Sequence, residues 1–86
     1  MREIQELTKQ FNGQTFAVGA NRMIDLSDPT IVRLGAEAKK IPQIKAVKFY
    51  QPGSWSSAYH KPGDLDVSVE EVSPSKWKIK ALLFDY

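Results

Sequence analysis

The spacing of apolar residues predicts a helix near the start of the chain, over residues 2–11. Ile4, Leu7 and Phe11 recur at intervals of three and four residues, so a helix would place all three on one face. An Asn-Gly pair follows directly, and it readily adopts the left-handed conformation that ends many helices. We therefore expect a short helix that rests one face on the core.

A second helix is predicted over residues 27–42. Ser27 or Asp28 can accept hydrogen bonds from the free N–H groups of the first turn, and Pro29 suits the first helical position. Pro42 ends the pattern, because the residue before a proline disfavours the helical conformation. The apolar stripe of this helix consists of Ile31, Leu34, Ala38 and Ile41.

Residues 14–26 alternate between apolar and polar positions and predict extended structure. Phe16, Val18 and Ala20 would share one face of a strand. A glycine and an asparagine interrupt the alternation. The pattern fits either two short strands around a tight turn or one bulged strand, and both arrangements stay open.

Residues 43–50 predict a strand with apolar side chains on both faces. Val47 and Phe49 would face one side, and Ile44 and Ala46 the other. Such strands are typical of positions that are covered on both sides. We therefore expect this strand at the centre of the sheet or next to the centre.

The last part of the chain predicts a β-hairpin, because residues 65–72 and 76–84 both alternate strictly. A turn over residues 73–75 brings the matching faces together, and a slip of one residue would set valines against lysines. In this register the cross-strand pairs are Val69–Ile79, Val67–Ala81 and, on the solvent face, Glu70–Lys78. A five-residue turn that pairs Glu70 with Lys80 keeps the same faces and stays open.

The two faces of this hairpin are predicted to differ in polarity. Inward positions are Leu65, Val67, Val69, Trp77, Ile79, Ala81 and Leu83. Outward positions are Asp66, Ser68, Glu70, Lys76, Lys78 and Lys80.

Together these elements predict one α+β domain. Their order is helix, one or two strands, helix, strand, long loop and hairpin. Two helices would pack on one face of a mostly antiparallel sheet of four or five strands. All 86 residues would belong to this domain, because cores rarely divide below about 150 residues.

Composition narrows the ways in which such a small domain is stabilised. Apolar residues make up 42% of the chain and charged residues 26%, which excludes a disordered tail. The absence of cysteine excludes disulfides, and a single histidine argues against a zinc site. We therefore expect no metal and no cofactor, and leave self-association as a homodimer open.

The N-terminal sequence MREIQELTKQ lacks the continuous apolar run of a secretory signal. No stretch approaches the about 18 apolar residues that a membrane span needs. These two observations predict a cytoplasmic protein with no membrane partner.

Residues 50–64, YQPGSWSSAYHKPGD, stand apart from the predicted helices and strands. Two Pro-Gly pairs lie near its ends, and each suits a tight turn because proline sets the first bend and glycine accepts a positive φ. The middle of the chain is also cationic, since no acidic residue lies between Glu37 and Asp64. The segment therefore combines stiff turns, aromatic rings and positive charge.

These features predict a small non-enzymatic binding or regulatory protein, of an inhibitor type, that uses this loop to engage an acidic partner. The partner would be a nucleic acid or a protein of a nucleic-acid-handling machine. Aromatic rings stack on bases or anchor protein contacts, and lysines attract acidic groups. The size and class also fit a regulator carried by a phage or another mobile element. The predicted partner-binding residues are Lys48, Tyr50, Trp55, Tyr59, His60 and Lys61.

The aromatic residues have a structural alternative. Rings in a long loop can fold back over a small core, and this alternative is open above all for Trp55. Trp77 instead lies within a strand pattern, so we expect it in the core.

Catalysis is the second function that the sequence allows. His60 could act as the general base of a small basic, metal-independent ribonuclease of the toxin type, with Lys61 and nearby lysines stabilising the phosphate charge. The neighbouring serines lack the contexts of known hydrolase motifs, so we expect no catalytic residues of that kind. Asp64 and Asp66 are expected to be solubilising charges on the outer face of the hairpin rather than cation ligands.

Overall fold

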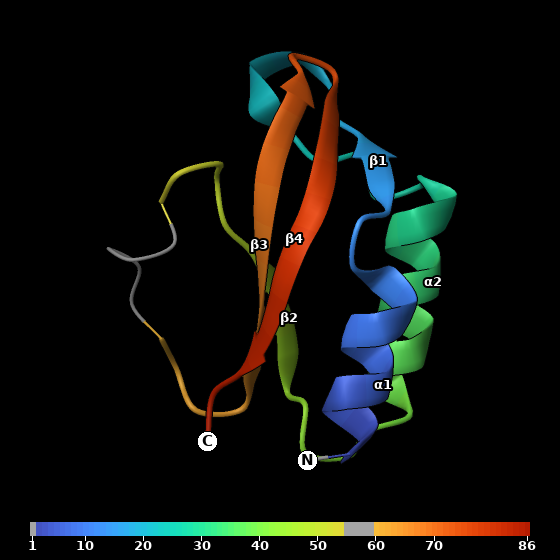
Figure 1. Ribbon diagram of the computed structural model, residues 1–86, viewed down its shortest axis with the longest axis vertical. Coiled ribbons are helices and arrows are strands. Elements are labelled where there is room, and N and C mark those ends of the chain that lie inside the picture. The colour runs from blue at the N-terminus through green and yellow to red at the C-terminus, as the bar shows by residue number, and fades with distance from the viewer. Residues whose placement is uncertain (1, 55–59) are drawn as a thin grey trace.

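The computed structural model describes residues 2–54 and 60–86. Within these residues the chain forms two helices, one 3₁₀ turn and a four-stranded sheet, which is the predicted α+β class (Figure 1). Neither of these helices has the length and apolar character needed to cross a membrane. The elements are α1 (Arg2–Phe11), β1 (Thr15–Ala17), the 3₁₀ turn η1 (Ala20–Arg22), α2 (Pro29–Lys39), β2 (Ala46–Phe49), β3 (Asp64–Ser73) and β4 (Lys76–Phe84).

Both helices form where the apolar spacing predicts them. α1 buries the three apolar residues of its predicted face. α2 starts after Asp28, whose Oδ1 accepts a hydrogen bond from the Thr30 N–H at 2.8 Å. Oδ2 of the same carboxylate accepts a hydrogen bond from the Ala17 N–H at 3.0 Å. One side chain therefore caps α2 and ties it to β1.

Residues 14–26 form one short strand and a 3₁₀ turn, so the second strand of the first predicted arrangement is reduced to a single bridge residue. Ala20, predicted on the strand face, lies in the turn and is exposed. β1 leads into η1, and Val18 and Ile24 meet in an isolated antiparallel bridge. Asn21 and Arg22 have φ angles of 60° and 61° in this turn. The chain thus reverses direction before α2 begins.

The sheet has the strand order β1-β4-β3-β2 (Figure 1). β4 pairs antiparallel with β1 and with β3, whereas β2 pairs parallel with β3. β2 therefore lies at an edge, and its predicted place at or near the centre is wrong. The reason is that Ile44 precedes the strand and Ala46 is exposed, so only Val47 and Phe49 of β2 turn apolar side chains to the core.

The β3–β4 hairpin has the predicted register at Val69, Glu70 and Glu71, but the predicted turn over residues 73–75 is wrong. Ser73 pairs with Lys76, so the turn consists of Pro74 and Ser75, and Val72 has no counterpart on β4. Val69 lies opposite Ile79. Glu70 lies opposite Lys78, and Lys78 Nζ is 3.5 Å from Glu70 Oε2. The alternative with a five-residue turn, which pairs Glu70 with Lys80, does not form.

The register shifts farther from the turn, because β4 contains one extra residue. Lys80 has no counterpart on β3 and forms a β-bulge. Val67 consequently lies opposite Leu82, and the predicted pairing of Val67 with Ala81 is wrong. The inward residues beyond the bulge are Leu82 and Phe84 instead of the predicted Ala81 and Leu83.

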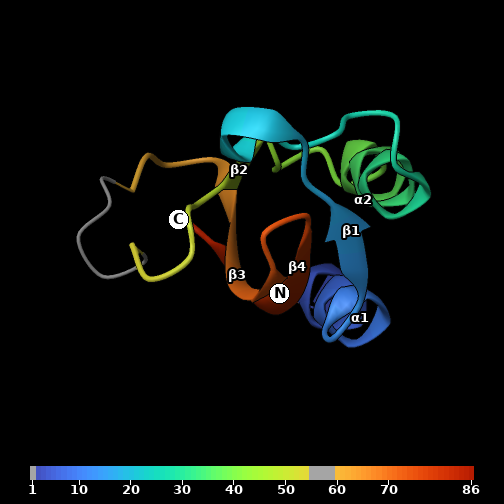
Figure 2. The same cartoon turned by 90° about the horizontal axis from the view of Figure 1, so that it is seen from above.

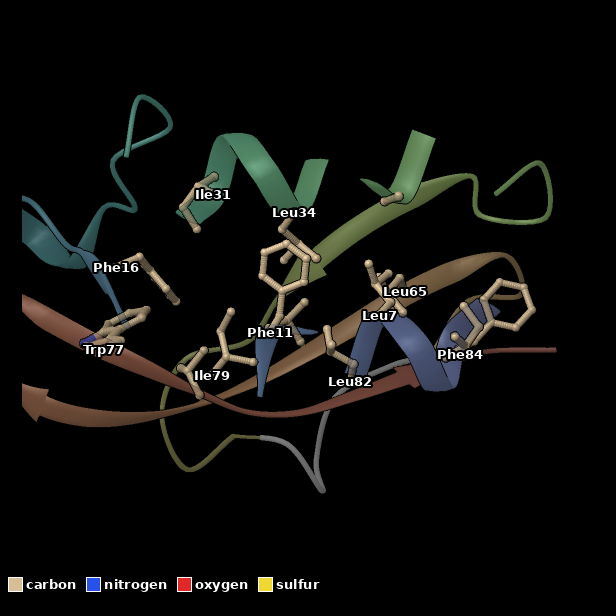
Figure 3. Packing of buried hydrophobic residues seen from close by; sticks show 14 of the residues in the cluster. Leu7, Phe11, Phe16, Ile31, Leu34, Leu65, Trp77, Ile79, Leu82 and Phe84 are labelled. Atoms are coloured by element: carbon tan, nitrogen blue, oxygen red, sulfur yellow. The ribbon is translucent and has the colours of Figure 1, made fainter. Parts of the chain in front are cut away.

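The two faces of the sheet are covered by different parts of the chain (Figure 2). α1 and α2 lie on one side, and the described parts of the β2–β3 connection, residues 50–54 and 60–63, lie on the other. The hydrophobic core fills the space between helices and sheet (Figure 3). Trp77 is fully buried there, as predicted, with its ring edge-to-face to Phe16 at 6.2 Å between centroids. Asp66 is equally buried, although it carries an ionisable group.

Candidate functional site

The candidate site centres on Asp66 in β3. Leu65 and Val67 on either side face the core, so strand alternation turns Asp66 to the face opposite the helices. Asp66 is 0% exposed, and Asp64 and Ser68 on the same face are also buried. The prediction that Asp64 and Asp66 are solvent-facing charges is therefore wrong. Because β2 and β3 are parallel, the chain between them must return along the sheet, and its described parts, residues 50–54 and 60–63, lie on this side.

His60 contacts the buried carboxylate directly. Its Nδ1 lies 2.7 Å from Asp66 Oδ2. An ionised carboxylate only accepts hydrogen bonds, so with Asp66 ionised the proton sits on Nδ1 of His60 and is donated to Oδ2. The side chain of His60 is 36% exposed, so the imidazole links a buried charge to the surface.

Tyr50 supports the imidazole from the end of β2. Its Oη lies 3.3 Å from His60 Nδ1, and the two rings meet edge to face with centroids 5.7 Å apart. Its backbone N–H donates to the Val67 carbonyl at 3.1 Å, which extends the pairing of β2 with β3. Burial, and then the charge of Asp66, raises the pKa of Tyr50 to about 12, so its hydroxyl stays protonated at neutral pH.

Tyr50 is only 5% exposed. Its predicted role as a surface ring that stacks on a partner does not fit this position, because nearly all of the ring already packs inside the protein. Tyr50 instead supports the base of the connection.

Asp85 reaches the same cluster from the end of β4. Its N–H donates to the Asp64 carbonyl at 3.0 Å, and its carbonyl accepts from the Gly63 N–H at 2.8 Å. Its Oδ1 lies 3.8 Å from His60 Nδ1. A hydrogen bond with the Asp66 carboxyl, followed by burial, raises the pKa of Asp85 to about 6.

In each of the Asp66 and Asp85 carboxyl groups, one oxygen lacks a hydrogen-bond donor among the described residues. Asp66 Oδ1 and Asp85 Oδ2 are buried and have no hydrogen-bond partner among the residues that the structure describes. When both groups are ionised, they therefore repel each other in a site of low polarity. A shared proton or a cation would relieve this repulsion.

The two Pro-Gly pairs form the turns that the sequence predicts. Gly53 and Gly63 have φ angles of 83° and 91°, which favour glycine. The Ser54 N–H donates to the Gln51 carbonyl, and the Asp64 N–H to the Lys61 carbonyl, both at 3.1 Å. A side chain at Gly63 would also collide with Lys45, whose Cγ lies 2.7 Å from the position of an added Cβ.

Of the predicted partner-binding residues, the structure brings Lys48, Tyr50 and His60 together on one face of the sheet. Lys48 lies opposite Asp66 in the parallel pairing, and its Nζ is 5.2 Å from the centroid of the Tyr50 ring. Lys61 is exposed next to His60. Trp55 and Tyr59 lie outside the described residues.

Sequence reasoning overlooks the two carboxyl groups that hold the site together. Asp66 is assigned to an exposed face, and Asp85 is given no role. One signal was present: a long connection after a strand, with a tyrosine at its start and the single histidine near its end, fits a segment that packs across a sheet face. Nothing local points to Asp85.

This arrangement allows three roles. The His60–Asp66 contact can hold the β2–β3 connection in place, or it can orient the imidazole for proton transfer. The cluster of His60, Asp66 and Asp85 can also bind a cation. His60, Asp66 and Asp85 each offer a ligand atom, and these atoms lie within 4.8 Å of one another. Comparisons with protein-family models, with curated proteins and with solved structures gave no match to this chain.

Proposed function

We propose that this protein is a small non-enzymatic binding protein that engages an acidic partner through residues 50–64 and the lysines beside them. The observation that supports this proposal is the attachment of the connection at both ends. Tyr50 is bound to β3 through its backbone, and His60 is bound to buried Asp66 at 2.7 Å. The connection is thus attached to the sheet at Tyr50 and at His60.

Fixed ends favour binding because ordering a loop on contact costs conformational entropy. Each mobile side chain that becomes immobilised costs about 0.5–1.5 kcal/mol, and a loop that is already ordered at its ends avoids part of this cost. In the sequence, Trp55 and Tyr59 lie between the two anchored ends. These two rings are the aromatic anchors of the proposed surface.

Lysines flank the same segment. Lys48 lies at its start, and Lys61 is exposed at its end. Lys45 is also exposed, and its N–H donates to the Gly63 carbonyl at 2.7 Å, which places it next to the second turn. Clustered cations raise the on-rate of an acidic partner, and this steering weakens as salt increases.

The first experiment measures binding of a fluorescein-labelled single-stranded RNA by anisotropy at several salt concentrations. The variant Lys48→Gln/Lys61→Gln removes two lysine charges and with them two proposed phosphate contacts. The slope of the logarithm of the association constant against the logarithm of the salt concentration should become shallower by about 1.4, since each contact contributes about 0.7. The matched control is Lys76→Gln/Lys80→Gln, which removes the same charge from exposed positions of β4. Equal losses in both variants would contradict a localised surface.

The second experiment tests the aromatic anchors with Trp55→Ala/Tyr59→Ala. We expect the fold to survive and affinity to fall by about 2 kcal/mol, or about 30-fold. If RNA does not bind, the same variant is compared with the wild type in capture of an acidic protein. Unfolding of the variant would assign the two rings to the core and contradict the proposal.

A ribonuclease is the second candidate, and the His60–Asp66 contact favours it. A carboxylate that binds one ring nitrogen fixes the orientation of an imidazole, which is how many enzymes position a general base. Cleavage of labelled RNA that is lost in His60→Ala and retained in Lys76→Gln would support this candidate. RNA that stays intact with the wild-type protein, with and without divalent metals across the pH range, would rule it out.

A further inference from the structure

His60, Asp66 and Asp85 come from three separate segments and converge on one point. Asp66 is central in β3, Asp85 follows β4, and His60 lies near the end of the β2–β3 connection. His60 Nδ1 is 2.7 Å from Asp66 Oδ2 and 3.8 Å from Asp85 Oδ1. One imidazole and two carboxylates thus place three potential metal-ligand atoms within 4.8 Å of one another.

Two carboxylate oxygens of this cluster are buried without a hydrogen-bond donor among the described residues. Asp66 is fully buried, and its Oδ1 has no hydrogen-bond partner among the described residues. Asp85 Oδ2 is also buried and has no hydrogen-bond partner among the described residues. Buried carboxylates are normally paired or coordinate a metal, because removing an unpaired charge from water costs several kcal/mol. The imidazole contacts Oδ2 of Asp66 and leaves these two oxygens unsatisfied.

The spacing of the donors fits a first-row metal. With bonds of about 2.1 Å, neighbouring ligands lie about 3.0 Å apart in octahedral and about 3.4 Å apart in tetrahedral coordination. His60 Nδ1 lies 2.7 Å from Asp66 Oδ2 and 3.8 Å from Asp85 Oδ1, on either side of these values, and the three donor atoms all lie within 4.8 Å of one another. Small side-chain shifts would therefore suffice to place an ion between the three atoms.

We propose that His60, Asp66 and Asp85 bind a divalent transition-metal ion of the manganese-to-zinc class, with water in the other positions. An imidazole ligand favours these ions over magnesium and calcium, which prefer oxygen alone. The ion would take the place of the proton on Nδ1 of His60, and in a neutral imidazole that proton moves to Nε2. It would tie the β2–β3 connection to both central strands. The site needs no partner molecule and stands even if residues 50–64 bind nothing.

The test titrates chelator-treated protein with Zn²⁺ and with Mn²⁺ by calorimetry. We expect one ion per chain, with at least one of the two metals binding more tightly than Mg²⁺. Saturation should raise the thermal midpoint by about 10 °C at a hundredfold excess over Kd. The proposal would be overturned if neither Zn²⁺ nor Mn²⁺ gave a heat of binding or changed the thermal midpoint. It would also be overturned if Mg²⁺ bound as tightly as, or more tightly than, both of these metals.

Variants locate the ion. Asp85→Asn and His60→Gln should each weaken binding at least about tenfold, since loss of a second-sphere residue alone often costs that much. Glu70→Gln is the matched control, because it removes an exposed carboxylate from the same strand as Asp66 and should leave the affinity unchanged. Equal affinity in all three variants would place the ion elsewhere and overturn the assignment.

A readout on the unaltered protein covers the case in which a variant fails to fold. The chain has a single histidine, so long-range ¹H–¹⁵N spectra report His60 without ambiguity. Zn²⁺ should shift the Nδ1 resonance and leave the ring proton on Nε2. Ring nitrogen signals that stay unchanged at saturating Zn²⁺ would overturn the proposal. The metal titrations, the variants and the His60 spectra do not depend on a partner. Their outcome would therefore stay the same if the protein bound neither RNA nor an acidic protein.

Discussion

At the scale of the residue, Asp66 is the most unusual position of the molecule. Its carboxylate is 0% exposed in a sheet, where apolar residues are the rule. Oδ2 accepts a hydrogen bond from His60 at 2.7 Å, and Oδ1 is directed to no donor among the described residues. The hydrogen bond to His60 therefore stabilises the fold, whereas the negative charge, buried beside Asp85, destabilises it when no cation is bound.

The variant Asp66→Asn separates shape from charge. The amide keeps the volume, can accept from His60 through its oxygen and can donate to Asp85, while the repulsion between two carboxylates disappears. In the presence of chelator we expect its thermal midpoint to equal or exceed that of the wild type. Asp66→Ala should lose about 1–3 kcal/mol, because it removes the carboxylate that accepts the hydrogen bond from His60.

Thermal unfolding of both variants in the same buffer checks this expectation. If Asn destabilises the protein as much as Ala does, the charge attraction between His60 and Asp66 exceeds the carboxylate repulsion, and the prediction is wrong.

At the scale of the element, one extra residue in β4 determines which side chains enter the core. Ile79 faces inward before the bulge at Lys80, and Leu82 and Phe84 face inward after it. Regular alternation from Ile79 would instead turn Ala81 and Leu83 to the core. The bulge thus places Leu82 in the core where regular alternation would place the smaller Ala81.

Two single-residue deletions should have opposite outcomes. Deleting Lys80 removes the bulge and still leaves Leu82 and Phe84 inward, so we expect a change in stability within about 1 kcal/mol. Deleting Leu83, which is 47% exposed, turns Phe84 outward and should cost about 3 kcal/mol or more. Urea denaturation of both proteins provides the measurement, and equal losses would show that the bulge itself is required.

At the scale of the whole molecule, both faces of the sheet contribute buried residues although the chain has only 86 residues. The helices cover the apolar face, and the described parts of the β2–β3 connection lie on the side of Asp66 (Figure 2). Phe11 fills the centre of the helix side, where it is 0% exposed and lies between α2 and the sheet (Figure 3). With about 0.05–0.15 kcal/mol per residue, the total stability is about 4–13 kcal/mol.

Phe11→Ala should therefore remove a large share of that stability. Loss of a buried phenylalanine costs about 3–5 kcal/mol, so the urea midpoint should fall sharply with little change in the slope m. Val32→Ala is the control on α2, because Val32 is 54% exposed, and it should shift the midpoint only slightly. Similar midpoints for the two variants would refute the central place of Phe11 in the core.

The sequence by itself determined the elements whose signals are local. Both helices form at the predicted positions, because apolar spacing, Asp28 as a cap and Pro29 at the first turn all lie within a few residues. The hairpin pairing of Glu70 with Lys78 next to its turn is equally local. The turns at both Pro-Gly pairs follow from residues that are adjacent in the chain.

Only the tertiary structure decided the arrangement of the strands and the composition of the site. The edge position of β2 depends on its parallel pairing with β3, which no nearby residue specifies. The bulge at Lys80 interrupts the regular alternation of β4, and the sequence pattern does not mark it. Burial of Asp66 and its meeting with His60 and Asp85 depend on the return of the connection across the sheet. The physical reason is that these contacts join distant segments, so their free energy depends on the packing of the whole chain and not on local preference.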